Sequence, residues 1–514
     1  MRDLIVVGGG LGGLALAGLT QSEGARVALC EAHTKLGGCA GYFDRDPFTF
    51  DVGATALMGT SPTGPIGALV ENLGLDFQIA ETPAYRVCLP DREFAITSDP
   101  DQFGLASDRV FPGRLRNKRL FWRLQEAIGE RLFQVASKVP RLPLRAWGDL
   151  IHDLRALGPS GLLAASTWGL TVLDVLRLLG LDRDRPFRSL IAMLLQDAAQ
   201  AGPETVPFAN GAVCLQAYRR GLGRPVGGMK ALAEGIGQRF IELGGELKRG
   251  TLVDRVETQA DGFTVVTRRR ERLPTRQVAF NLPIDLAARL LGRDLSGPLA
   301  KDEHKARPAW SAFTAYLAFR RDAIDDNASL FHQVLQDYDE PIHDGNNVLI
   351  SLSPPGNTGY GPEDTRVATF STHTRPTDWL DLRGDSYHEK KTQFAERMRK
   401  ALSRALPGAL EAIVHAEFAS PRSFARYTRR TAGAVGGPPV ARRNSNFLAV
   451  GPDVLGPRTW LVGDSVFPGQ GTMAVVLGAI RVAELVLGRS PSLMDAMSGR
   501  TERIAWGLEA PLKR

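Results

Sequence analysis

The glycines and the acid near the N-terminus have the types and the spacing to hold a dinucleotide. Gly8, Gly10 and Gly13 satisfy the pattern G-x-G-x-x-G directly after the apolar run Leu4–Val7, and Glu31 ends a second apolar run. The first glycine allows a tight turn, the second lets the backbone approach a pyrophosphate, and the third lets helix and strand pack closely. The N-terminus of the following helix offers N–H groups to phosphate oxygens. The Glu31 carboxylate can accept hydrogen bonds from ribose hydroxyls and would repel the 2′-phosphate of NADP.

Two further glycine-rich segments carry the same kind of chemistry. Gly37 and Gly38 follow shortly after Glu31, and Gly463-Asp464 ends an apolar run near the other end of the chain. A glycine-rich loop then leads into the apolar stretch Val475–Leu487, which we expect to be helical. A strand, a glycine loop and a helix in this order again direct backbone N–H groups at a polar ligand.

Together these segments resemble the carotenoid desaturase and isomerase flavoproteins, the phytoene-desaturase-like family, and more distantly the amine oxidases. The likeness extends over nearly the whole chain. Gly38–Tyr42 and Phe50–Thr55 are most similar to the C-3′,4′ carotenoid desaturases and the carotenoid isomerases. Amine oxidases usually carry arginine where this chain has Cys39, which disfavours an amine or porphyrinogen oxidase.

The resemblance implies FAD as the cofactor and assigns roles to residues along the chain. It places the glycine pair after Glu31 near the flavin and pyrophosphate, Val253 at the adenine, and Asp464 at the ribityl and phosphate region. The helix that begins near Thr472 is then directed at the flavin ring. The residues that the motifs and the resemblance assign to the cofactor are Gly8, Gly10, Leu11, Gly12, Gly13, Glu31, Gly37, Gly38, Cys39, Gly53, Ala54, Val253, Gly463, Asp464, Thr472 and Met473.

The elements that must position these residues predict an α/β fold. With the resemblance, they indicate a Rossmann-like FAD-binding domain of the glutathione-reductase type, interrupted by a mixed α+β substrate domain. We expect the FAD-binding domain to comprise residues 1–75, 215–290 and 445–490, and the substrate- and membrane-facing domain to comprise 76–214 and 291–444. Residues 491–514 are expected to form a C-terminal tail.

Within the substrate domain, the apolar spacing predicts two helices and two strands. The helices are expected over Arg119–Ser137 and Leu170–Leu181. The strands are expected over Ala312–Phe319 and Val367–Ser371, where they could form a sheet that walls a substrate tunnel.

Charge and hydropathy favour peripheral contact with a membrane. The formal net charge of +7 suits an anionic membrane surface or ligand. A nucleic-acid partner is not indicated, because there is no zinc spacing and no compact stripe of basic and aromatic residues. The longest uncharged apolar stretch, Gly161–Leu173, is shorter than the roughly 20 residues that span a bilayer. We therefore expect a cytoplasmic, peripherally membrane-associated protein.

The aromatic and leucine residues between positions 119 and 181, Trp147 and Trp168 among them, admit two interpretations. They are ordinary core with solvated arginines on the far face, or they are an amphipathic surface that rests on lipid while arginines reach the headgroups. The resemblance to enzymes that draw their substrates from membranes favours the second.

Other reactive side chains carry less information. None of the four cysteines forms a C-x-x-C pair and none of the eight histidines shows metal-ligand spacing, so no metal is expected. His373 lies in a segment that resembles the desaturases and is a candidate pocket residue. For Asp51 we favour loop capping over a role at the flavin, and for Cys39 packing over redox chemistry. No catalytic residue is singled out.

The function that these observations favour is desaturation of a long apolar polyene, a carotenoid, by hydride transfer to FAD. Two alternatives stay open. One is a redox-neutral carotenoid isomerase or a saturase that uses reduced FAD. The other is a lipid or prenyl carrier that keeps the fold without catalysis, which predicts eroded cofactor motifs; here those motifs are intact.

Overall fold

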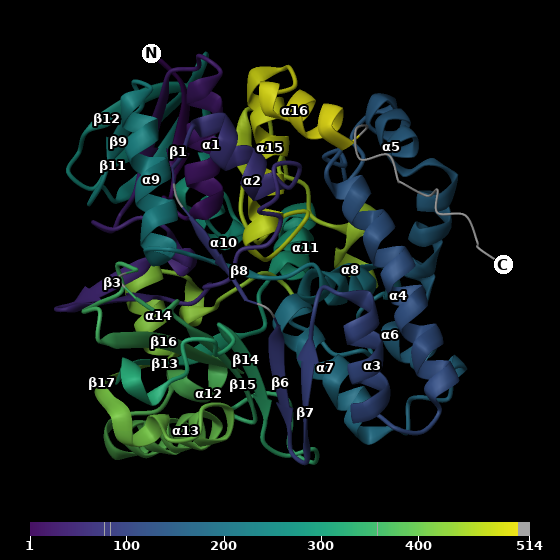
Figure 1. Cartoon of the computed structure of the whole chain (residues 1–514). Helices are drawn as coiled ribbons and strands as arrows, with labels where there is room; N and C mark the ends of the chain where they lie inside the picture. Colours follow the sequence, from purple (N-terminus) through teal and green to yellow (C-terminus); the bar gives the residue numbers. More distant parts are fainter. Residues whose placement is uncertain (77, 83, 357, 502–514) are drawn as a thin grey trace.

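The computed structural model describes residues 1–76, 78–82, 84–356 and 358–501, which form two large sheets and a lobe of helices (Figure 1). The strands of the first sheet are β1 (Arg2–Val7), β2 (Val27–Cys30), β9 (Glu246–Lys248), β10 (Val253–Gln259), β11 (Gly262–Thr267), β12 (Arg272–Phe280) and β18 (Thr459–Leu461). Their order is β10-β11-β12-β1-β2-β9, with β18 paired to β12. Because β1 pairs in parallel with β2 and β12, and β12 with β18, the carboxyl ends of these strands meet at one edge.

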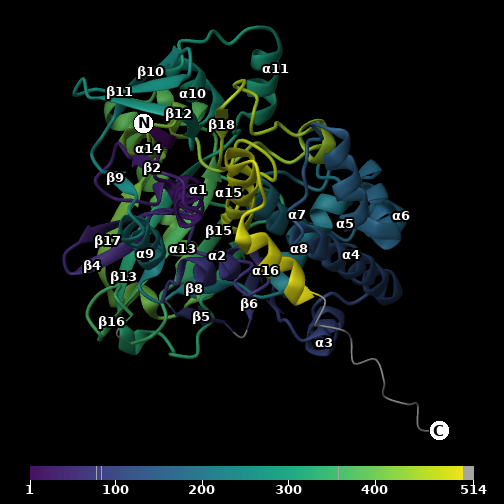
Figure 2. The ribbon, with the colours of Figure 1, turned by 90° about the horizontal axis from the view of Figure 1, so that it is seen from above.

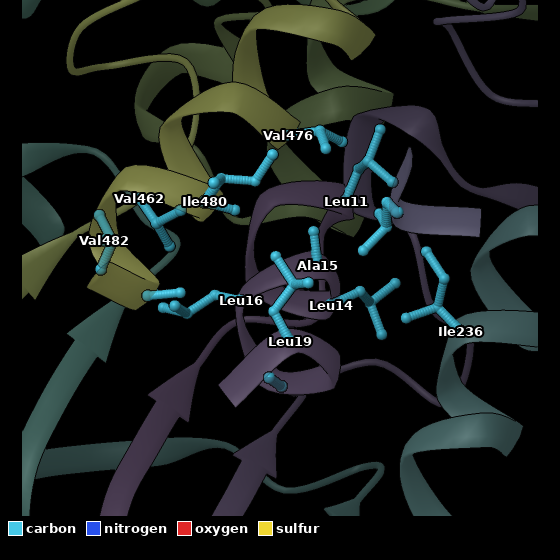
Figure 3. Close-up of a cluster of buried hydrophobic side chains, with 14 of the residues drawn as sticks. Leu11, Leu14, Ala15, Leu16, Leu19, Ile236, Val462, Val476, Ile480 and Val482 are labelled. Atoms are coloured by element: carbon cyan, nitrogen blue, oxygen red, sulfur yellow. The ribbon is translucent and has the colours of Figure 1, made fainter. Parts of the chain in front are cut away.

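Helices cover both faces of this sheet, as a buried parallel sheet requires. One face carries α1 (Leu11–Ser22), α2 (Pro65–Leu73), α9 (Gly228–Glu242) and α15 (Thr472–Leu487). Since α1 contains no charged residue and is buried from its first residue to Thr20, it must be enclosed on all sides. Figure 3 shows its leucines packed between Ile236 of α9 and Ile480 of α15. The other face carries α10 (Ile284–Leu290) and α11 (Gly297–Ala306).

The second sheet also has seven strands, in the order β17-β13-β16-β15-β14-β6-β7. Its members are β6 (Tyr85–Leu89), β7 (Arg92–Ile96), β13 (Ser311–Arg320), β14 (Phe331–Leu335), β15 (Asn347–Leu352), β16 (Thr365–Thr374) and β17 (Ile413–Ala419). Both strands predicted in this part of the chain are confirmed, as β13 and β16, which pair antiparallel with Ala315 opposite Phe370. Helices α12 (Thr377–Leu380) and α13 (Gly384–Ala405) contribute Trp379 and Phe394 to the core beneath this sheet.

The third part is a helical lobe. It contains α3 (Pro100–Val110), α4 (Leu115–Ala136), α5 (Trp147–Ser166), α6 (Val172–Leu178), α7 (Arg185–Ala199) and α8 (Phe208–Arg219). In both views α4, α5 and α6 lie on the side of the molecule opposite β9 and β11 (Figures 1 and 2). The helix predicted over Arg119–Ser137 is confirmed within α4. The helix predicted over Leu170–Leu181 is shorter, because Thr171 caps its start by accepting from the Asp174 N–H at 3.1 Å.

Smaller elements link these parts. They are the ladder of β3 (Tyr42–Arg45) with β4 (Phe48–Asp51), the ladder of β5 (Ile79–Glu81) with β8 (Gly223–Pro225), α14 (Pro421–Thr428) and α16 (Ser492–Thr501). The segment that we expected to be a C-terminal tail thus begins with a helix, whose Leu493 and Met497 are buried in the core beside α2. Residues 502–514 of that tail lie outside the described residues. Among the described helices, none combines the length and the hydropathy needed to cross a bilayer.

Candidate functional site

A cavity of 1020 Å³ lies between the carboxyl edge of the first sheet, the second sheet and helices α7 and α8. Its position is the one at which α/β folds usually bind ligands, and its volume is at the upper end of the roughly 300–1,000 Å³ typical of ligand pockets. Fourteen of the sixteen predicted cofactor residues line it; Gly13 and Met473 lie behind its wall. The fourteen are Gly8, Gly10, Leu11, Gly12, Glu31, Gly37, Gly38, Cys39, Gly53, Ala54, Val253, Gly463, Asp464 and Thr472.

The glycine loop forms one end of this cavity. Gly8 has a φ of +104°, which favours glycine. A Cβ at Gly13 would lie 2.1 Å from the Gly8 carbonyl oxygen, so Gly13 allows α1 to begin directly against the turn. Among the described residues, the N–H groups of Leu11 and Gly12 have no hydrogen-bond acceptor. The first turn of α1 therefore presents free donors to the cavity, as a phosphate site requires.

Asn281, the residue after β12, holds this end together, although it belongs to none of the cofactor motifs of the sequence. With its amide oriented to satisfy both neighbours, it donates to the Val462 carbonyl at 3.1 Å and accepts from the Gly10 N–H at 3.0 Å. A Cβ at Gly463 would lie 2.6 Å from this amide. One side chain therefore fixes the glycine loop after β1 against the segment after β18. The signal that could have found it is its position at the end of a strand parallel to β1.

Glu31 and the glycine pair fix the next part of the wall. The Glu31 Oε2 accepts from the Gly9 N–H at 2.6 Å, and its Oε1 accepts from the His33 N–H at 2.6 Å. Gly37 has a φ of +102° and donates to the Gly9 carbonyl at 2.8 Å. The Glu31 carboxylate is thus held at the end of β2, as predicted, while each of its oxygens keeps capacity for a further donor.

Gly463 and Asp464 follow β18, which ends at Leu461 rather than at the acid. Arg430 donates to both Asp464 oxygens, at 2.7 and 3.0 Å. The same guanidinium contacts the Cys39 thiol. Burial raises the pKa of that thiol, so Cys39 is protonated at neutral pH, which agrees with a packing role. Arg430 has no local sequence signal, because α14 and a turn bring it to the cavity.

Thr472 and Met473 are the first two residues of α15, and only Thr472 lines the cavity. Thr472 lines the cavity and donates to the Ala56 carbonyl at 3.1 Å. The Met473 sulfur packs against Gly59, where a Cβ would lie 2.9 Å from it. Successive helix residues point in directions about 100° apart, so only one of this pair can face the cavity.

Asp51 lies outside the cavity wall and is fully buried. Its Oδ2 pairs with Arg224 at 2.9 Å, and its Oδ1 accepts from the Met229 N–H at 2.8 Å, at the start of α9. Asp51 therefore caps the start of α9 and forms a buried ion pair, rather than capping its own loop as expected.

The far end of the cavity is walled by the second sheet and the helical lobe. His373 lines it, as suggested by the sequence, with its Nε2 3.2 Å from the Gln200 Nε2. Burial lowers the pKa of His373 to about 4, so the ring is neutral at physiological pH. Apolar side chains of Met58, Leu222 and Leu349 complete this end. The cavity therefore joins a polar, glycine-lined end to an apolar end.

The residues present suit a dinucleotide with an attached ring system. Glycines occupy positions where a Cβ would intrude, free N–H donors face the cavity at α1, and carboxylates stand at the ends of β2 and β18. The Oε1 atom of Gln200 is buried at the wall without a hydrogen-bond partner among the described residues, which marks an acceptor available to a bound group.

Known proteins resemble this chain in sequence and in fold. Residues 6–73 match the model of the NAD(P)-binding Rossmann-like domain. The chain is 24% identical to the chloroplastic prolycopene isomerase of Daucus carota, over 96% of this chain and 82% of that protein. It is also 24% identical to the lycopene-forming phytoene desaturase of Pseudescherichia vulneris, over 95% of this chain and 99% of that protein.

Solved structures share the architecture. The cyclohexylamine oxidase of Brevibacterium oxydans superposes with a TM-score of 0.60 over 98% of this chain and 100% of that one, at 15% identity. Identity this low shows the fold alone, so the match says nothing of an amine substrate. The comparisons confirm the predicted α/β fold with a Rossmann-like domain and the resemblance to carotenoid desaturases and isomerases, and they support a flavin or nucleotide cofactor.

The close contact at Gly13 yields a prediction about stability. Gly13→Ala forces a methyl group onto the Gly8 carbonyl, and we expect it to lower the free energy of unfolding by about 1–3 kcal/mol, the usual cost of overpacking. Chemical denaturation measures this.

Gly235→Ala is the matched control, because Gly235 lies inside α9 with nothing within 4 Å of its added Cβ. The helix propensity of alanine predicts a gain of up to about 1 kcal/mol there. Equal stability of the two variants would contradict the packing of α1 against the turn.

Proposed function

We propose that this chain, a relative of the carotenoid desaturases and isomerases, is an FAD-dependent enzyme that desaturates a long apolar polyene of the carotenoid type. The observation that carries the proposal is the continuity of the cavity. One end is a glycine cradle at the carboxyl edge of a Rossmann-like sheet, and the other end is an apolar chamber between the second sheet and the helical lobe. A cofactor held at the first end faces a substrate held at the second.

FAD is the cofactor that suits both carboxylates of the polar end. Glu31 stands where a ribose would lie, after the first turn of the Rossmann unit. Asp464 stands on the far side of the glycine loop, which Asn281 holds against the same edge. A nicotinamide dinucleotide would need only the first of these, whereas a bound FAD would be held by residues at both, with Glu31 at the ribose and Asp464 at the ribityl and phosphate region.

The chain's own residues supply binding and exclusion of water. A bound flavin can accept a hydride and so provides the oxidation. Met58, Leu222 and Leu349 offer the apolar contacts that would orient a polyene, and Arg430 neutralises the charge of Asp464, which would hold the ribityl and phosphate region.

A redox-neutral isomerase is the second candidate, because the chain matches prolycopene isomerases over 94–96% of its length. Mass spectrometry distinguishes the two reactions. Purified holoprotein is incubated with phytoene, lycopene or prolycopene, with the flavin oxidised or reduced. Loss of two mass units with oxidised flavin is the expected result. A product of unchanged mass formed only with reduced flavin would establish the isomerase, and a gain of two mass units would establish a saturase.

The carrier alternative predicts a colourless protein, and a variant sharpens that test. Glu31→Lys replaces the acceptor at the ribose position with a cation, and we expect it to lower bound flavin at least about tenfold, the loss of one charged hydrogen bond. Glu389→Lys, on the exposed surface of α13, makes the same change away from the cavity. Flavin absorbance measures both. Wild-type protein without flavin would rule out the enzyme reading.

We also propose that the helical lobe rests on an anionic lipid surface, from which an apolar polyene can enter. On α5, Trp147, Ile151 and Leu154 share one face and are 82%, 47% and 42% exposed. On α4, Leu120 and Leu124 are also exposed, whereas Phe121 and Phe133 of the same helix are core. The core interpretation therefore describes one face of these helices, and the other face leaves exposed apolar side chains that support the proposed lipid contact.

Arginines accompany the exposed faces. Arg123 lies beside Leu120 and Leu124, and Arg155 lies beside Ile151 and Leu154. Both are exposed, and neither forms an ion pair with another described residue. Exposed apolar side chains with adjacent cations are the signature of a helix that lies in a lipid interface.

Vesicle flotation tests this surface. Trp147→Glu combined with Ile151→Glu removes two exposed apolar groups of the α5 face. We expect at least about a tenfold loss of binding to vesicles containing phosphatidylglycerol, since burying each such side chain contributes about 1.5–3 kcal/mol. Val414→Glu on β17, also an exposed apolar residue, is the control. Equal binding of all three proteins would contradict the proposed orientation.

A further inference from the structure

We propose that the Asp197 carboxylate accepts the proton that the polyene loses during desaturation, and that the Tyr218 hydroxyl positions this carboxylate. The proposal rests on the proposed function and names a residue for a step that the sequence left unassigned. Asp197 lies in the last turn of α7 and lines the apolar end of the cavity together with Tyr218.

The end of α7 that carries Asp197 is tied to the loop before α15. The Gln470 amide donates to the Ala198 carbonyl at 2.9 Å and so ties the end of α7 to the loop that leads into α15. Thr472, the first residue of α15, lines the same cavity. Asp197 is half-buried, and the part of it that stays accessible belongs to the cavity wall. It therefore stands between the cofactor-facing loop and the apolar chamber.

Asp197 differs from every other carboxylate on the cavity wall. Glu31 accepts two backbone N–H groups, Asp464 is paired with Arg430, and Glu417 is paired with Arg45. The remaining carboxylate, Asp44, is held by Lys35 and Lys230. Within the described residues, Asp197 has neither a cation nor a backbone donor; its partner is the Tyr218 hydroxyl. A carboxylate with no cation to satisfy it is the one free to take a proton.

The Tyr218 hydroxyl can serve both protonation states of Asp197. Its oxygen lies 3.0 Å from the Asp197 Oδ2 and 3.1 Å from the Leu194 carbonyl oxygen. When Asp197 is ionised, the hydroxyl donates to the carboxylate. When Asp197 is protonated, its own O–H can donate to the Tyr218 oxygen, while the hydroxyl turns to the Leu194 carbonyl. The pair therefore stays hydrogen-bonded before and after proton transfer.

The surroundings give Asp197 the basicity for this role. Burial raises the pKa of Asp197 to about 6, against the hydrogen bond from Tyr218, which lowers it. The titratable groups that face it are Tyr218 and Cys214 on α8 and Tyr85 on β6, and burial raises the pKa of each of them, so they are neutral. A group whose pKa lies near the operating pH is both ionised and basic, which general-base catalysis needs.

The neutral ring of His373, on the same wall, is a poorer acceptor. Burial lowers the pKa of His373 to about 4, so its protonated form is too acidic to retain a proton near neutral pH. Asp197 is therefore favoured over His373 as the proton acceptor.

The step balances in atoms and electrons. One substrate C–H bond breaks with its electron pair leaving as hydride, and the oxidant that receives it is the FAD of the proposed function. The neighbouring C–H bond breaks, its electron pair becomes the new π bond, and its proton passes to the Asp197 carboxylate. The substrate loses two electrons and the flavin gains two, and the Asp197 carboxylic acid then returns its proton to water.

The test compares Asp197→Asn with Asp153→Asn in the flavin-loaded protein. Asp153 is likewise a buried aspartate whose pKa burial raises, but it lies on α5 away from the cavity wall. For Asp197→Asn we expect kcat to fall by about 100-fold or more, the range of general-base catalysis, with KM and flavin content close to wild type. The wild-type rate rises with pH through about 6, the pKa of Asp197; this limb disappears in Asp197→Asn and persists in Asp153→Asn.

Tyr218→Phe provides a readout that a merely structural role would not move, and protein stability reports the titration of Asp197 independently of activity. Removing the Tyr218 hydroxyl removes the interaction that lowers the pKa of Asp197, so the pH limb shifts to higher pH. Because the folded state holds the Asp197 proton more tightly than the unfolded state, the contribution of Asp197 to the free energy of unfolding falls as pH rises from about 4 to about 6, and the difference between wild type and Asp197→Asn measures it. This contribution is absent in Asp197→Asn.

Two results would overturn the proposal. One is a kcat and pH limb of Asp197→Asn equal to those of wild type. The other is decisive even if Asp197→Asn does not fold. It is a wild-type rate that does not change through pH 6, or a rising limb of the pH–rate profile that lies at the same pH in Tyr218→Phe as in wild type. Failure of the proposed function looks different: wild-type protein then lacks flavin or leaves every polyene unchanged, while the stability profile still reports the titration of Asp197.

Discussion

The close approach of three chain segments around Asn281 is the constraint on which the site depends. Its amide joins the Gly10 N–H to the Val462 carbonyl, and glycine stands at each position where a side chain would force these segments apart. A Cβ at Gly10 would lie 2.4 Å from that amide. Residues separated by more than 450 positions in the chain therefore share one hydrogen-bonded corner. The free donors of α1 and the carboxylates after β2 and β18 all take their places from it.

Electrostatic pairing then divides the cavity into regions with different chemistry. At the glycine-lined end, carboxylates are paired with arginine or lysine or accept hydrogen bonds from backbone N–H groups, as buried or half-buried charges require. Behind the wall, the Asp51–Arg224 pair is fully buried and connects β4 to β8 and to the start of α9. At the apolar end, burial without a cation leaves one aspartate with a raised pKa. Aspartate is thus an ion-pair partner at one place and a carboxyl with a raised pKa at another, because its surroundings differ.

The local sequence patterns predicted which segments form helices and strands better than they predicted the residues at which these begin and end. The runs after positions 3 and 26 are strands, and the amphipathic stretch from Arg119 forms most of α4, because apolar periodicity reports directly on which side is buried. The helix expected to begin at Leu170 begins at Val172, since a capping threonine overrides the apolar run. The predicted C-terminal tail begins instead with a helix whose Leu493 and Met497 are core, because two apolar residues in a polar segment carry too weak a signal by themselves.

By itself, the sequence determined the Rossmann-like unit and most of the residues that line the glycine-rich end of the cavity. The strand, the glycine turn, the helix and the acid are neighbours in the chain, so their pattern can be recognised locally. The tertiary structure alone decided what stands opposite them. Arg430 meets Asp464 and Cys39, Asn281 joins two glycine loops, and Asp197 reaches the cavity beside Tyr218. These pairs come from segments that no local pattern connects. Their chemistry depends on burial and on partners, and both exist only once the two sheets and the helical lobe have packed around one cavity.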